Sequence, residues 1–142
     1  MTAPEIAPQK ARWLRAIGYG LLAEIATIIT IVAIVLLYKY AFSRGLSDAD
    51  YVVFAQRVGA TVGVVGGTLY VYLFAHRLMR RLTSRFVAHG VVVAIAAIAL
   101  SVAGSIAGHQ GVPPAYLVAS ALKLIAGGLA GWAASRRAPL LT

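Results

Sequence analysis

Residues 16–38 read AIGYGLLAEIATIITIVAIVLLY, a run of 23 residues in which Glu24 is the single charged side chain. About 20 apolar residues in a helix are enough to cross the hydrocarbon core of a bilayer, which is about 30 Å thick. Lysine and arginine residues flank the run on both sides. The run therefore predicts a transmembrane helix, at about residues 14–40, that crosses the membrane with some tilt.

Three further apolar runs follow, and each is long enough to span a bilayer. Their boundaries predict helices at about residues 51–76, 86–107 and 114–135. Because the connections between the runs are short, neighbouring helices should run in opposite directions. The sequence thus predicts an all-α fold, an integral membrane four-helix bundle in up-down order, formed by a single transmembrane domain over residues 1–142.

The composition supports a membrane environment and excludes several kinds of site. Hydrophobic residues make up 61% of the 142 residues and charged residues 12%, with a mean hydropathy of +0.84. The chain has no cysteine, which excludes disulfides, thiolate metal sites and iron–sulfur clusters. His76 and His89 are interpreted as interfacial hydrogen-bonding residues rather than metal or haem ligands. We therefore expect no metal and no cofactor.

Catalytic motifs are also missing from the sequence. We find no serine–histidine–acid set, no HExxH and no phosphate-binding glycine-rich loop, and the glycines lie inside apolar runs. The sequence predicts that the protein is not an enzyme.

The basic residues are unevenly distributed between the two ends of the predicted helices. The formal net charge is +9. Nine lysines and arginines fall on one side: Lys10, Arg12, Arg15, Arg77, Arg80, Arg81, Arg85, Arg136 and Arg137. Three fall on the other side: Lys39, Arg44 and Arg57. The positive-inside rule then predicts a bacterial-type inner-membrane protein with both termini in the cytoplasm. The basic connection should lie against anionic lipid headgroups. Because the basic residues cluster at helix ends, we expect no nucleic-acid partner.

Two charged residues lie deep within the apolar runs. Glu24 is about eight residues, or ~12 Å, into the first helix, and Lys123 is about eight residues from the opposite end of the fourth. Their depths differ by about 6 Å across a core of roughly 30 Å, so the sequence predicts an intramembrane pair. Such a pair either fixes the helix register or takes part in a proton or ion relay. Thr27, Ser101 and Ser105 are predicted to extend a polar pathway from it.

Small residues recur at helical spacing on two of the predicted helices. Gly59, Gly63 and Gly67 are four residues apart in the second helix, and Gly127 and Gly131 are four apart in the fourth. Stripes of this kind let helix backbones approach closely. We expect these glycines to pack helices together, within the bundle or in an oligomer.

Two classes of function agree with these features. The first is an oligomeric channel for a small ion or solute, or a proton-coupled carrier, that uses the intramembrane Glu24. The alternative is a non-catalytic accessory or assembly subunit that docks a larger membrane complex through its glycine faces. The expected partners are accordingly a second copy of the chain or another membrane protein.

Overall fold

A computed structural model of the chain describes residues 9–108 and 114–137, which contain four long helices. They are α1 (Gln9–Leu37), which continues into the short π-helix η1 (Tyr38–Phe42), α2 (Asp48–Met79), α3 (Phe86–Ala107) and α4 (Pro114–Arg137). All four are long and apolar enough to cross a membrane. The predicted all-α four-helix bundle is confirmed.

The start of α2 shows how local chemistry sets a helix boundary. The hydroxyl of Ser47 accepts a hydrogen bond from the backbone N–H of Asp50 at 3.3 Å, and donates one to the Asp50 carboxylate at 2.7 Å. Asp48 and Asp50 also place negative charge in the first turn, where it interacts favourably with the helix dipole. The helix consequently begins at Asp48, three residues before the predicted boundary.

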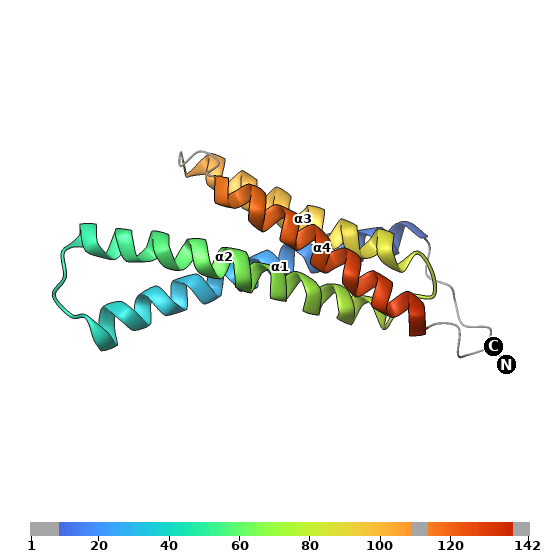
Figure 1. Cartoon of the computed structure of the whole chain (residues 1–142), viewed down its shortest axis with the longest axis horizontal. Coiled ribbons are helices and arrows are strands. Elements are labelled where there is room, and N and C mark those ends of the chain that lie inside the picture. Colours follow the sequence, from blue (N-terminus) through green and yellow to red (C-terminus); the bar gives the residue numbers. More distant parts are fainter. Residues whose placement is uncertain (1–8, 109–113, 138–142) are drawn as a thin grey trace.

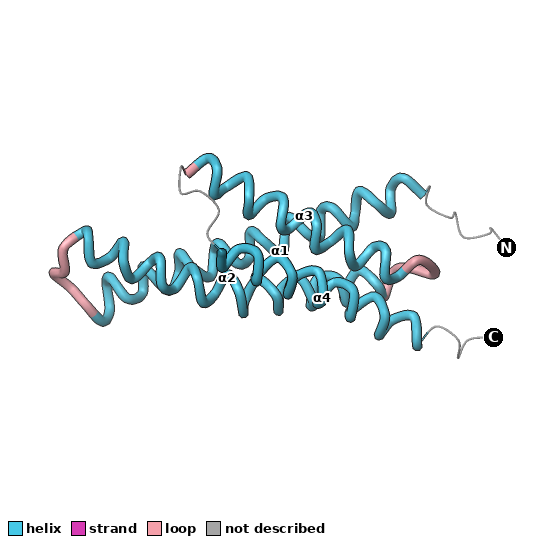
Figure 2. The backbone as a smooth tube through the Cα atoms, turned by 45° about the horizontal axis from the view of Figure 1, so that its top comes forward, coloured by secondary structure: helices cyan, strands magenta, loops and turns pink. Residues whose placement is uncertain are grey.

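The four helices form two hairpins that pack side by side (Figure 1). α1 packs against both α2 and α3, and α4 likewise packs against both α2 and α3. The start of α1, the turn between α2 and α3, and the end of α4 lie at the same end of the bundle (Figures 1 and 2). We call this the basic end, because it carries the arginines that flank these segments, and the opposite end the far end.

The α1–α2 hairpin is longer than the α3–α4 hairpin and projects beyond it at the far end (Figures 1 and 2). Its tip is held by contacts of its own. The rings of Tyr38 and Phe54 stack with centroids 3.7 Å apart, and the Tyr51 hydroxyl donates a hydrogen bond of 2.6 Å to the carbonyl of Ser43. The ribbons of the two hairpins diverge towards this end (Figure 1).

The buried apolar core lies on one side of the level of Glu24 and Lys123. It consists largely of alanines and includes Ala23 at 1%, Val93 at 0% and Ala126 at 5% exposure. All of its residues lie between that level and the basic end, a region that we call the basic half; the remainder is the far half. Large aliphatic side chains on the outside of the bundle, such as Ile29 and Leu117, are exposed, as expected for helices that face lipid.

Candidate functional site

The two intramembrane charges lie near the middle of their helices. Glu24 is twelve residues after Arg12, or ~18 Å along the axis of α1, and Lys123 is nine residues after Pro114, or ~14 Å along α4. Because the two helices run in opposite directions, these positions bring the residues to the same level. Both side chains are buried, with 8% of Glu24 and 4% of Lys123 exposed.

Glu24, Lys123 and Ser101 form a closed set of hydrogen bonds, which we call the charged cluster. Lys123 Nζ lies 2.6 Å from Glu24 Oε2. The hydroxyl of Ser101 donates to Glu24 Oε1 and accepts a hydrogen bond of 3.0 Å from Lys123 Nζ. Each carboxylate oxygen thus has a partner, which offsets part of the large cost of removing the charges from water.

The second helix contributes space rather than a polar group to the charged cluster. A Cβ atom at Gly67 would lie 2.8 Å from Lys123 Cε and 3.5 Å from Lys123 Nζ. The lysine stem therefore runs against the bare backbone of α2 to reach Glu24. The sequence predicted Gly67 only as a helix-packing residue, because nothing in the sequence indicated that α2 and α4 are neighbours.

The predicted pathway residues lie at or beyond the charged cluster, on the side of the far end. Thr27, which is 1% exposed, is one turn further along α1 and donates a hydrogen bond of 2.9 Å to the carbonyl of Ala23. Ser105 is buried one turn beyond Ser101 on α3. Ser101 hydrogen-bonds both members of the charged pair.

A further polar contact in the far half was not anticipated. Thr30 donates to the carbonyl of Ala26 at 2.8 Å, and its oxygen lies 2.9 Å from the hydroxyl oxygen of Tyr70 on α2. Because Thr30 has a single hydroxyl proton, we infer that Tyr70 donates the bond between helices. The position of Tyr70 within an apolar run is the signal in the sequence that its hydroxyl needs a hydrogen-bond partner.

The glycines divide into two groups. A Cβ at Gly127 would lie 2.3 Å from the carbonyl oxygen of Gly90, and one at Gly131 would lie 2.5 Å from Val87 Cα, so α3 and α4 touch through their backbones. Around Gly59 and Gly63, in contrast, a Cβ would meet nothing within 4 Å. Close packing of these two glycines within the described part of the bundle is therefore not seen, and their packing in an oligomer stays a prediction.

Two close approaches in the basic half involve glycines that the sequence analysis did not select. Gly90 faces Gly127 as described, and a Cβ at Gly20 would lie 2.3 Å from the carbonyl oxygen of Val93 and 2.7 Å from the Ala96 methyl group. Neither residue has another glycine four positions away, so no repeat marked it. The basic half is thus closed by backbone contacts on two sides of α3.

His76 and His89 each stack on an aromatic ring. His89 is 4% exposed, stacks on Trp13 with ring centroids 4.1 Å apart, and has Nδ1 2.9 Å from the carbonyl oxygen of Arg85. His76 stacks at 6.1 Å with Tyr72 on its own helix. Within residues 9–108 and 114–137, no group of three or more histidine, cysteine or acidic side chains is placed to hold a metal ion.

No protein-family model, curated protein or solved structure matches this chain.

Proposed function

We propose that this chain is a membrane protein that moves a small ion or solute in a proton-coupled manner, with Glu24 as the proton-binding residue. The observation that carries the proposal is the charged cluster, in which two buried charges and a hydroxyl from three helices meet at the middle of the bundle. Charged side chains at this depth are costly in a bilayer and commonly mark ion or substrate pathways. An ion pair alone would add little net stability, because desolvation opposes it.

The surroundings of the charged cluster support access from the far end. Towards that end, each of three helices places hydroxyl groups within about two turns of the cluster: Thr27 and Thr30 on α1, Ser105 on α3 and Ser120 on α4. Towards the basic end, the buried residues nearest to it are apolar, such as Ala97 and Ala126. Hydroxyl groups can hydrogen-bond water or an ion, whereas alanine methyl groups cannot.

Charge balance indicates what can accompany the proton. A proton that bound to Glu24 alone would remove its charge and leave Lys123 as a buried cation without a counter-charge. A proton that entered together with an anion would keep the net charge of the site at zero, since the anion would take the place of the carboxylate beside Lys123. We accordingly favour the co-transport of a proton with a small anion.

We further propose that the basic end faces the cytoplasm of a bacterial-type inner membrane. The support is the distribution of nine basic residues at this end against three at the far end. Labelling from outside the cell with an impermeant maleimide tests the orientation. A cysteine at Leu46, which is exposed and next to the capping Ser47, should react, and one at the exposed Ser84 should not. The reverse pattern would contradict this orientation.

Proton flux into liposomes tests the transport function. The full chain is reconstituted with a pH-sensitive dye inside, and chloride or impermeant gluconate is added outside together with an acid step. We expect flux with chloride, and at least about a tenfold loss in Glu24→Gln. Asp48→Asn is the matched control, since it makes the same chemical change on an exposed residue of α2. An absence of flux for every anion tested, or equal flux in both variants, would contradict the proposal.

The second candidate is a non-catalytic accessory or assembly subunit of a larger membrane complex. The observation that favours it is the face of α2 around Gly59 and Gly63, where an added Cβ would meet no atom of the described chain within 4 Å. Small residues of this kind accept the backbone of another helix. The mass of the complex extracted from native membranes in a mild detergent distinguishes the candidates. One or more copies of this chain alone would favour transport, and a stoichiometric second protein would favour the subunit.

A further inference from the structure

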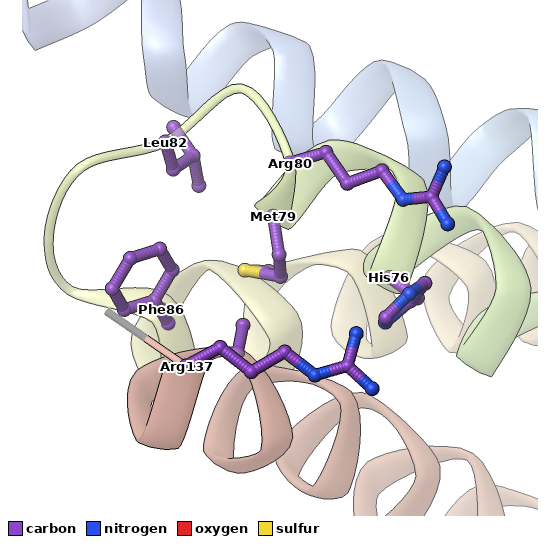
Figure 3. Close-up of a pocket in the computed structure, with 7 residues that line it drawn as sticks. His76, Met79, Arg80, Leu82, Phe86 and Arg137 are labelled. Carbon is purple, nitrogen blue, oxygen red and sulfur yellow. The ribbon is translucent and has the colours of Figure 1, made fainter. Parts of the chain in front are cut away.

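A pocket at the basic end combines basic side chains with an apolar wall. It has a volume of about 150 Å³ and lies between the end of α2, the start of α3 and the end of α4 (Figure 3). Three of its lining residues are basic: His76, Arg80 and Arg137. In Figure 3 the guanidinium groups of the two arginines lie on either side of the His76 ring.

The rest of the pocket wall is apolar. Met79, Leu82, Phe86 and Ala134 complete the lining, and Met79 is 3% exposed. A ligand that fits this surface has an anionic group at one side and a hydrocarbon part at the other. The volume is smaller than those of pockets that hold drug-sized ligands, which are about 300–1,000 Å³.

Within residues 9–108 and 114–137, no acidic side chain neutralises the basic groups of the pocket. The acidic residues of the described chain are Glu24, Asp48 and Asp50, and all three lie away from the basic end. Neither Arg80 nor Arg137 takes part in an ion pair with any residue in the described ranges. The Nδ1 atom of His76 is buried and likewise has no hydrogen-bond partner among them. The pocket therefore holds hydrogen-bonding capacity that the fold itself does not use.

The geometry points to a binding site for the phosphate group of an anionic phospholipid, held by Arg80, Arg137 and His76. Guanidinium groups bind phosphate oxygens through two parallel hydrogen bonds, and the imidazole can donate one more. The carbonyl ends of α2 and α4 carry partial negative charge at this level and the N-terminus of α3 carries partial positive charge, so the basic side chains supply most of the attraction for the anion. The apolar wall then contacts the glycerol and the first methylenes of an acyl chain.

Native mass spectrometry of the full chain, released from an uncharged detergent and titrated with phosphatidylglycerol, tests this site. Arg80→Gln and Arg137→Gln should each weaken binding of the first lipid about tenfold, the loss expected for one charge-assisted contact. The adjacent Arg81 and Arg136 provide matched controls, because neither lines the pocket and the guanidinium of Arg136 lies over the Trp132 ring at 4.1 Å. Their glutamine variants should stay within about twofold of the wild type.

Two further experiments distinguish binding in this pocket from other kinds of lipid or phosphate binding. Ala134→Leu fills the pocket without changing the charge, and it should weaken the lipid even though all arginines remain. Inorganic phosphate, added as a competitor, should bind far more weakly than the lipid because it lacks the apolar part. Equal weakening in all four arginine variants would overturn the site in favour of diffuse attraction, and inorganic phosphate that bound as tightly as the lipid would overturn the assignment to a phospholipid.

Discussion

The two halves of the bundle use the same small residues in opposite ways. In the basic half, Gly127 and Gly131 bring α4 against the backbone of α3, and alanines fill the remaining space. In the far half, Gly59 and Gly63 have the same spacing on α2, but an added Cβ at either would meet nothing within 4 Å in the described chain. The charged cluster lies at the boundary between these regions. Small residues therefore close the bundle on one side of the charges, while hydroxyl groups line the helices on the other.

The largest predicted effect concerns Glu24 and Lys123, the two charges at the boundary between the halves. Lys123→Met leaves a buried carboxylate and Glu24→Gln leaves a buried ammonium group, and each should lower the free energy of unfolding by about 3–5 kcal/mol. The double variant removes both charges, so its loss should fall short of the summed single losses by about 2–3 kcal/mol. Unfolding in mixed detergent measures the free energy of unfolding of the wild type, the two single variants and the double variant. Asp48→Asn serves as a control away from the charged pair. Additive losses would show that the pair is not coupled.

The glycines provide the next effect, and it should differ in sign between the halves. Gly127→Ala places a methyl group against the carbonyl of Gly90, so α3 and α4 must move apart, at a cost of about 1–3 kcal/mol. Gly63→Ala meets nothing within 4 Å and should stabilise α2 by about 0.5–1 kcal/mol through helix propensity. The unfolding free energies of the two variants check this difference.

A larger side chain at Gly63 tests whether this face of α2 takes part in assembly. If the face of α2 around Gly63 is covered by another chain, Gly63→Leu should lower the size of the detergent-extracted complex while the monomer remains as stable as before. An unchanged size would remove the one observation that favours the accessory role. Equal destabilisation by Gly63→Ala and Gly127→Ala would contradict the difference between the halves itself.

The smallest predicted effect concerns the hydrogen bond between Thr30 and Tyr70, which joins α1 and α2. Tyr70→Phe removes the hydroxyl that bonds to Thr30 and should cost about 0.6 kcal/mol, a value typical of hydrogen bonds between membrane helices. Tyr72→Phe is the matched control, two residues further along the same helix. Unfolding measurements on both variants give the difference, and a cost no larger than that of the control would show that the contact contributes nothing.

Much of this architecture follows from the sequence, and the reasons are physical. Apolar runs of sufficient length predict the four helices, because a chain segment that crosses lipid must satisfy its own backbone hydrogen bonds, as a helix does. Depth along the runs predicts that Glu24 and Lys123 lie at nearly the same level, and the structure brings them together. Ser101 was placed on the pathway for its polarity alone. Its direct contact with both charges depends on α3 lying beside α1 and α4, which no spacing within a run reveals.

Helix neighbours also explain what the sequence analysis missed. The spacing of Gly59 and Gly63 is identical to that of Gly127 and Gly131, yet within the described residues only the second pair lies so close to another helix that an added Cβ would collide with it. A stripe of small residues permits close packing without identifying the partner. The space that Gly67 provides for Lys123 likewise depends on α2 and α4 being adjacent, a consequence of how the two hairpins come together.

Access of water to the two sides of the charged cluster tests the central claim most directly. Single cysteines at Ser120 and Ala126 each lie three residues from Lys123 on α4, towards the far end and the basic end respectively. In the reconstituted full chain, a small charged thiosulfonate reagent should modify the cysteine at Ser120 and leave that at Ala126 unmodified. Modification at Ala126, or protection of both positions, would contradict an account in which the charges are open to the far half and sealed by the basic half.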